Sequence, residues 1–256
     1  MTIAIAPRFK TIEDEFKAAL SVLDGVLTYI ENYKPEPALR VMMLNNTIVA
    51  LVSTIEETLR DLFNEYLAIL EEGFSDYRWL RAQLRGANLE SAIQLLREHR
   101  SESDFDAVAV VRDLSRCLEG ARDFRLFKEE LTYNRGNFRS RQLTEMAKNL
   151  GIERMWEQIC DSAEVETYTG EAVLMTRVIR MTALWNEVFD ERDLVVHSIS
   201  KARGWGAEKI RQAALLFSLV IARVEASLVG DVSALIEQHD QRLAAAPTTG
   251  DEEGKR

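Results

Sequence analysis

The chain has 256 residues, of which 46% are hydrophobic and 29% are charged. These values are ordinary for a globular protein that buries a substantial core, and they exclude wholesale disorder. The formal net charge of −10 repels the phosphates of nucleic acids over most of the surface. The chain is therefore not a general coat for RNA or DNA, and such a ligand would need a local basic patch or a subunit interface.

Proline and glycine indicate the fold class. The sequence has four Pro and 12 Gly, and no Pro lies between Pro37 and Pro247, where average usage would place about ten. Strand-rich proteins of this size need many turns, and turns use Gly, Pro, Asn and Asp. We therefore expect an all-α fold.

Helical periodicity divides the chain into elements. Apolar residues at spacings of three and four predict helices over 9–33 and 38–72, separated by Pro35 and Pro37. The other predicted helices cover 89–98, 105–118, 122–131, 140–150, 153–159, 170–189, 207–228 and 232–243. We expect one helical domain over 1–243, with residues 74–135 as an inserted helical lobe, and a disordered tail over 244–256.

Several classes of site and location are disfavoured. Cys117 and Cys160 lack the spacing of a zinc site or a disulfide framework, and we expect both to be buried. The first ten residues are too short an apolar stretch for a signal peptide, and no uninterrupted apolar run nears the about 20 residues of a membrane span. We expect no metal or cofactor, no membrane contact and a cytoplasmic location.

The three histidines differ in their surroundings. His99 and His239 lie in charged helical segments, so we expect both on the surface. His197 is expected to be partly buried beside Arg192 and Asp193, where its charge can be tuned. Its apolar neighbours are Leu194, Val195, Val196 and Ile199.

Arg192 and His197 are the most promising candidates for chemistry. On a continuous helix, side chains five residues apart diverge by about 140°. We therefore predict that the helix ends between Phe189 and Asp193, so that both side chains converge on one small anion. Arg192 would supply a fixed charge, and His197 would carry a proton.

Basic residues near the pair could form the local patch that the acidic chain otherwise lacks. Arg135, Arg139, Arg141 and Lys148 precede the pair, with few acidic residues among them, and Lys201, Arg203, Lys209 and Arg211 follow it. Ordinary solvated helix faces are the alternative. Trp205 could stack on a base, but packing is the commoner role for it and for Trp185. Ser198 and Ser200 could bond RNA or cap a turn.

The order Arg192, Asp193, His197 resembles the hallmark of the HEPN superfamily of helical ribonucleases, in its RiboL-PSP-HEPN type: Arg, a polar residue, then His after four to six positions. Residues 52–59 and 136–152 resemble two further segments of that family. The likeness covers about residues 10–230. It implies a HEPN-like multi-helix bundle with additional helices.

The resemblance also implies a function. It is metal-independent RNA cleavage by 2′-hydroxyl attack, of the toxin or antiviral-defence type, without a cofactor and at a composite site in a homodimer. Arg192 and His197 would be catalytic, and Glu56 would brace Arg192. Asp193 stands where such proteins often have Asn, and would orient a neighbouring cation or raise its pKa. Residues expected to contact RNA are Lys201, Arg203, Arg135 and Arg139.

Two other functions compete with this one. A catalytically inactive HEPN-like binding or adaptor module is favoured by the acidic surface and by Asp193. An antitoxin or defence-system partner is compatible with either a nuclease or an adaptor. A metal-dependent enzyme is disfavoured, because no paired His and carboxylate stand at ligand spacing.

Overall fold

The computed structural model describes residues 4–98, 105–132, 138–197 and 204–245, and every regular element within these ranges is helical. The prediction of an all-α fold is therefore confirmed.

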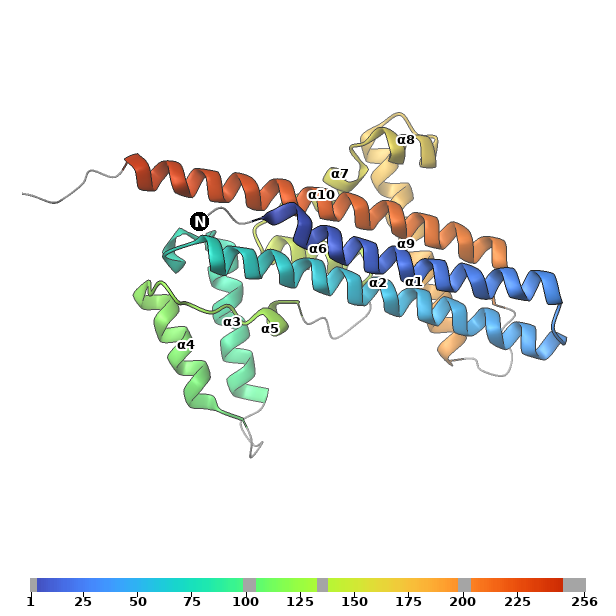
Figure 1. Ribbon diagram of the computed structural model, residues 1–256, viewed down its shortest axis with the longest axis horizontal. Helices are drawn as coiled ribbons and strands as arrows, with labels where there is room; N and C mark the ends of the chain where they lie inside the picture. The colour runs from blue at the N-terminus through green and yellow to red at the C-terminus, as the bar shows by residue number, and fades with distance from the viewer. Residues whose placement is uncertain (1–3, 99–104, 133–137, 198–203, 246–256) are drawn as a thin grey trace, which may run out of the picture.

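Three long helices lie side by side and form the centre of the molecule (Figure 1), and each of them contacts the other two. They are α1 (Ile5–Tyr33), α2 (Pro37–Gly73) and α10 (Ala207–Ala245). Pro37 suits the first turn of α2 because its backbone N has no proton to leave unbonded, and the Glu36 side chain caps that turn by accepting from the backbone N–H of Ala38 and Leu39.

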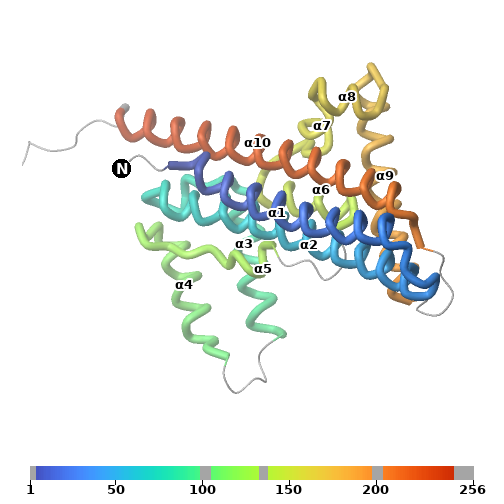
Figure 2. The backbone as a smooth tube through the Cα atoms, turned by 45° about the vertical axis from the view of Figure 1, so that its right-hand side comes forward, coloured from blue at the N-terminus to red at the C-terminus, as the bar shows by residue number. Residues whose placement is uncertain are grey.

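The shorter helices pack around this centre. Figure 2 shows the α3–α4 pair projecting from one side of the long helices, with α7 and α8 on the other. These elements are η1 (Tyr77–Trp79), α3 (Ala82–Glu98), α4 (Ala107–Glu119), α5 (Lys128–Thr132), α6 (Ser140–Asn149), α7 (Met155–Cys160), α8 (Ala163–Thr169) and α9 (Leu174–His197).

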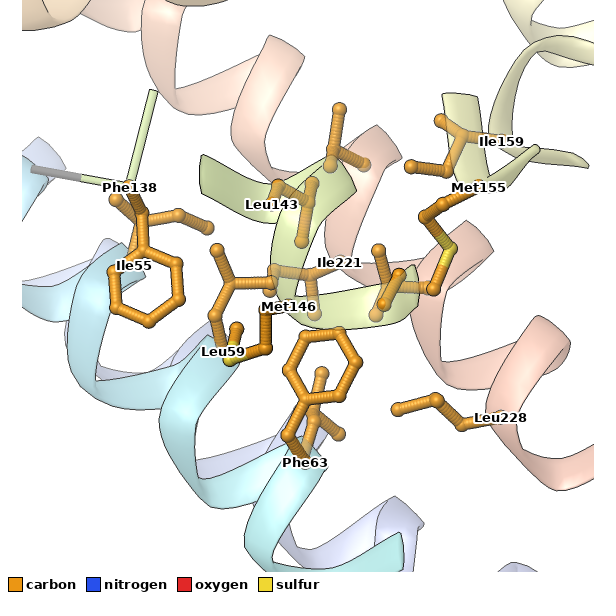
Figure 3. Close-up of a cluster of buried hydrophobic side chains, with 14 of the residues drawn as sticks. Ile55, Leu59, Phe63, Phe138, Leu143, Met146, Met155, Ile159, Ile221 and Leu228 are labelled. Carbon is orange, nitrogen blue, oxygen red and sulfur yellow. The ribbon is translucent and has the colours of Figure 1, made fainter. Parts of the chain in front are cut away.

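A buried hydrophobic cluster joins the long helices to the shorter ones. Ile55, Leu59 and Phe63 of α2 face Leu143 of α6 and Ile221 of α10 (Figure 3), and all five are almost fully buried. The same cluster continues into residues 74–135, whose contribution includes Phe74, Tyr77, Leu84, Cys117 and Phe124. The segment predicted as an inserted lobe thus shares the core of the long helices.

Some element boundaries differ from the prediction. Helix α9 continues to His197 because no Gly or Pro interrupts the chain after Phe189. Helix α10 continues through Gly230 as one element. Most of the helix predicted over 122–131 is absent, because the backbone N–H groups of Leu126 and Phe127 bond side chains of α2 and α3 instead. Helix α8 was not predicted.

Two helices are long and apolar enough to cross a membrane by length and composition alone. Windows of 18 residues in Pro37–Gly73 and Ala207–Ala244 have mean hydropathies of 1.5 and 1.8. Both helices are central to the bundle, and the core helices of soluble proteins meet the same test. These windows are therefore weak evidence for a membrane.

Candidate functional site

Arg192 lies on α9 where this helix packs against α2. Its Nη1 atom is 2.9 Å from Oδ1 of Asp193, and its Nη2 atom is 3.8 Å from Oε2 of Glu56. The Arg192 side chain is 24% exposed. The arginine is thus held between two carboxylates, and Glu56 lies within ion-pair distance, where a bracing residue would stand.

Glu56 connects α2 to the segment before α6. Its Oε1 atom accepts a hydrogen bond of 3.2 Å from the backbone N–H of Phe138. Burial raises the pKa of the Glu56 carboxyl above its ordinary value, although this hydrogen bond and Arg192 act in the opposite direction. Glu56 is therefore a half-buried acid that two neighbours help to keep ionised.

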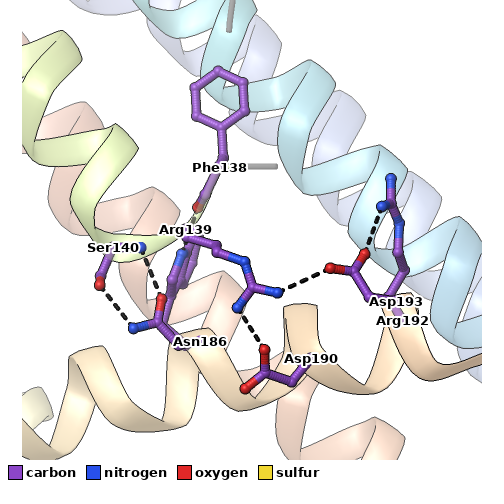
Figure 4. A network of polar contacts seen from close by, with 8 residues as sticks. Phe138, Arg139, Ser140, Asn186, Asp190, Arg192 and Asp193 are labelled. Atoms are coloured by element: carbon purple, nitrogen blue, oxygen red, sulfur yellow. Dashed lines mark hydrogen bonds and ion pairs between the residues drawn. The ribbon is translucent and has the colours of Figure 1, made fainter. Parts of the chain in front are cut away.

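Asp193 joins Arg192 to a second arginine (Figure 4). Its Oδ2 atom is 2.9 Å from Nη2 of Arg139, whose Nη1 atom is 2.5 Å from Oδ1 of Asp190. The hydrogen bonds to Asp190 and Asp193 raise the pKa of the Arg139 guanidinium. Arg139 is therefore tied to α9 by two carboxylates, which reduces the charge that it can offer to RNA.

The backbone on both sides of Arg139 is fixed to α9. The indole N–H of Trp185 donates to the carbonyl oxygen of Phe138 at 2.6 Å. Asn186 accepts from the backbone N–H of Ser140 and donates to the Ser140 hydroxyl, both at 2.9 Å. These bonds set the position from which the Arg139 side chain reaches Asp190 and Asp193. The role of Trp185, which is fully buried, is packing and anchoring.

His197 differs from its prediction. It is exposed rather than partly buried, as are Leu194 and Val196, whereas Val195 is buried. Because α9 does not end between Phe189 and Asp193, the directions of Arg192 and His197 diverge by about 140° along one helix. The predicted convergence of the two side chains at a helix end is therefore wrong.

Asp193 is the residue that relates Arg192 to His197. Asp193 precedes His197 by one helical turn, so both lie on the same face of α9. The guanidinium of Arg192 bends to the carboxylate of Asp193. Arg192, Asp193 and the exposed His197 thus follow one another along α9, and Asp193 is the residue that pairs with Arg192.

No family model, curated protein or solved structure matches the chain. The resemblance to HEPN proteins consequently rests on the sequence motifs alone.

The predicted basic patch is only partly described. Arg135, Lys201 and Arg203 lie outside the described residues, as do Ser198, Ser200 and His99. Arg139 and Arg141, which were expected to have few acidic neighbours, both pair with carboxylates, because the fold brings these from other turns and helices. Lys209 and Arg211 are paired as well. The pairs are Arg139 with Asp190 and Asp193, Arg141 with Glu145, Lys209 with Glu187, and Arg211 with Asp24 and Glu31.

Two aromatic residues also lie in unexpected settings. Trp205 is half-buried, and the Lys209 ammonium lies 4.0 Å from the centre of its ring. His239 was expected on the surface but is 3% exposed, because it stacks on Phe74 at a ring distance of 4.7 Å. His239 therefore helps to hold the C-terminal part of α10 against the end of α2, where Phe74 lies.

The structure also shows features that the sequence reasoning missed. Asn186, Asp190, Asp193 and His197 follow one another at spacings of four, three and four, and this pattern marks one face of a helix. That spacing could have revealed the polar ridge of α9. An apolar groove beside His197 was also missed, and its lining comprises Ala38, Val41, Met42, Asn45, Asn46, Val49, Val195 and Val196.

Other chemistries find little support in the described residues. Among these residues, no group of three or more His, Cys, Asp and Glu side chains is placed to hold a metal ion. Cys117 and Cys160 are buried and unbridged, and burial raises the pKa of each thiol to about 11. Neither thiol would be ionised at neutral pH, so neither is a promising nucleophile.

Proposed function

We propose that the chain is a metal-independent RNA endonuclease of the toxin or antiviral-defence type. One observation carries the proposal: Asp193 pairs with the guanidinium of Arg192 and lies one helical turn before the exposed His197 on α9. The segments that resemble RiboL-PSP-HEPN ribonucleases, which are residues 52–59, residues 136–152 and the motif from Arg192 to His197, also follow one another in the order of that family. RNA as the substrate and a cytoplasmic location belong to this proposal.

The proposed reaction needs a base, an acid and a fixed positive charge. One His197 takes the proton from the ribose 2′-hydroxyl, whose oxygen attacks the neighbouring phosphorus. The bond from phosphorus to the 5′-oxygen breaks, and a second imidazole gives that oxygen a proton. Arg192 stabilises the negative charge that develops on the phosphate oxygens. The products are a 2′,3′-cyclic phosphate and a 5′-hydroxyl.

We propose that a second copy of the chain completes this site. A single chain supplies one described histidine near Arg192, and among the described residues an apolar groove between α2 and α9 is open beside it. The described chain ends at Ala245, at the far end of α10 from this groove (Figure 1). Its own C-terminal helix therefore cannot cover the groove, whereas the same face of a second copy would bring a second His197 nearby.

Cleavage of RNA in excess EDTA tests the proposal. We expect products that carry 2′,3′-cyclic phosphates, and we expect His197→Ala and Arg192→Ala each to slow cleavage by about a hundredfold or more. His197 is exposed, so its replacement should leave folding intact. Arg180→Ala is the matched control, because Arg180 is exposed on the same helix and pairs with Glu171. Activity that persists in the double variant would rule the proposal out.

A catalytically inactive adaptor is the second candidate. The observation that favours it is that carboxylates outnumber the arginines they pair with. Asp193 pairs with both Arg139 and Arg192, Asp190 pairs with Arg139, and Glu56 pairs with Arg192. An adaptor would leave RNA intact as the wild-type protein and as the double variant. Its expression would also be harmless in both forms, whereas a toxin should impair growth only as the wild-type protein. An antitoxin or defence-system partner would then be its binding target.

A further inference from the structure

Two arginines from different elements hold the two oxygens of one carboxylate. Nη1 of Arg192 lies 2.9 Å from Oδ1 of Asp193, and Nη2 of Arg139 lies 2.9 Å from Oδ2 of the same side chain. The two guanidinium groups therefore approach Asp193 from separate directions, one from α9 itself and one from the segment that enters α6 (Figure 4).

This arrangement has the chemistry of an oxyanion site. Arginine is the side chain best suited to hold the oxygens of a carboxylate or phosphate, because its donors form a planar fork. The side chains of Arg139, Arg192 and Asp193 are 31%, 24% and 30% exposed, so an external anion could reach them. The backbone bonds at Phe138 and Ser140 fix one arginine in place independently of Asp193.

We infer that Arg139 and Arg192 form one binding site for a phosphate group, and that the carboxylate of Asp193 occupies this site and keeps it closed. Asp190 and Glu56 also pair with these arginines, but neither of them bridges the two guanidinium groups. Removal of the Asp193 charge would release one donor from each arginine. The anion site follows from this geometry, and only its assignment to the phosphodiesters of RNA rests on the proposed function.

The test compares two single-charge changes on the same helix. Asp193→Asn should raise the affinity for a labelled, uncleavable 2′-O-methyl RNA by about tenfold, and should steepen the salt dependence of log K by about one. Asp190→Asn is the matched control, because it removes the same charge from Arg139 but leaves the Asp193 bridge in place. We expect the control to change the affinity by less than about threefold.

Several outcomes would overturn the inference. An unchanged affinity in Asp193→Asn would do so, and so would an equal gain in Asp190→Asn, which would indicate a general charge effect. Tighter binding of inorganic phosphate without tighter binding of RNA would overturn the assignment to RNA. If Asp193→Asn fails to fold, Asp193→Ser removes the same charge and takes its place.

Cleavage assays separate this inference from the proposed function. If Asp193→Asn binds RNA more tightly but neither it nor the wild-type protein cleaves unmodified RNA, the nuclease proposal fails and the anion site stands. If the wild-type protein cleaves RNA and Asp193→Asn binds the uncleavable strand no better, the nuclease stands and the closed site is wrong.

Discussion

At the scale of single residues, Glu56 shows how the site balances burial against pairing. Its carboxyl accepts a backbone hydrogen bond from Phe138 and lies near Arg192, yet burial outweighs both and raises its pKa above the ordinary 4.5. The folded protein therefore retains a proton on Glu56 that the unfolded chain gives up at the same pH. It follows that this residue makes the fold less stable as the pH rises from its unfolded pKa through its folded pKa.

Glu56→Gln tests this balance. Glutamine keeps an oxygen that can accept from Phe138 but carries no charge to desolvate, so the variant should melt at a higher temperature than the wild-type protein at neutral pH. The difference should vanish at pH values well below 4.5, where both side chains are neutral. Thermal melts across this range provide the measurement. Glu145→Gln, on the exposed face of α6, should show no such gain, and a destabilised Glu56→Gln at neutral pH would contradict the expectation.

At the same scale, the geometry around Arg192 could be predicted only in part. Glu56 lies within ion-pair distance of Arg192, as expected, and their roles remain predictions. The exposure of His197 could not be predicted, because it depends on how far α9 extends beyond α2. The pairing of Arg139 with Asp190 and Asp193 joins residues more than 50 positions apart, and local spacing carries no information about such contacts.

At the scale of elements, α10 shows why periodicity located helices but misplaced some of their ends. Gly230 resembled a helix stop, yet the chain continues as one helix to Ala245. Asp231 and Val232 explain this continuity, since Val232 is fully buried and Asp231 is bound from two other elements. Glycine reduces helix stability by only about 1 kcal/mol, and tertiary contacts of this kind outweigh that cost.

Asp231 should consequently be a main contributor to stability. Its Oδ2 atom accepts from the Tyr66 hydroxyl at 2.7 Å, and its Oδ1 atom lies 2.7 Å from Nη2 of Arg81. Asp231→Ala would leave the buried Tyr66 hydroxyl without its acceptor and the Arg81 guanidinium with only the Gly151 carbonyl, and should lower the free energy of unfolding by about 3 kcal/mol. Urea denaturation measures this change. Asp240→Ala, at an exposed position of α10, should cost less than about 0.5 kcal/mol, and equal losses in the two variants would refute the role of Asp231.

At the scale of the whole molecule, exposed apolar side chains gather where the α1–α2 turn and the end of α9 meet. Leu39 and Met42 of α2 are 42% and 54% exposed, and Val196 of α9 is 41% exposed. Met42 and Val196 line the apolar groove. Contiguous apolar surface of this kind is typical of interaction sites, and its position beside His197 matches the second copy that the proposed reaction requires.

The mass of the protein in solution tests this arrangement. We expect the wild-type chain to elute with the mass of two copies in size-exclusion chromatography with light scattering. Val196→Asp should give one copy, because a carboxylate in the groove would lose its water on association, and RNA cleavage should fall with it. Ile179→Asp is the matched control, since Ile179 is 65% exposed on the same helix but nearly five turns away, and this variant should remain a dimer. A wild-type chain that stays monomeric at high concentration, or a dimer that both substitutions disrupt equally, would show that the groove between α2 and α9 is not the surface that joins two copies.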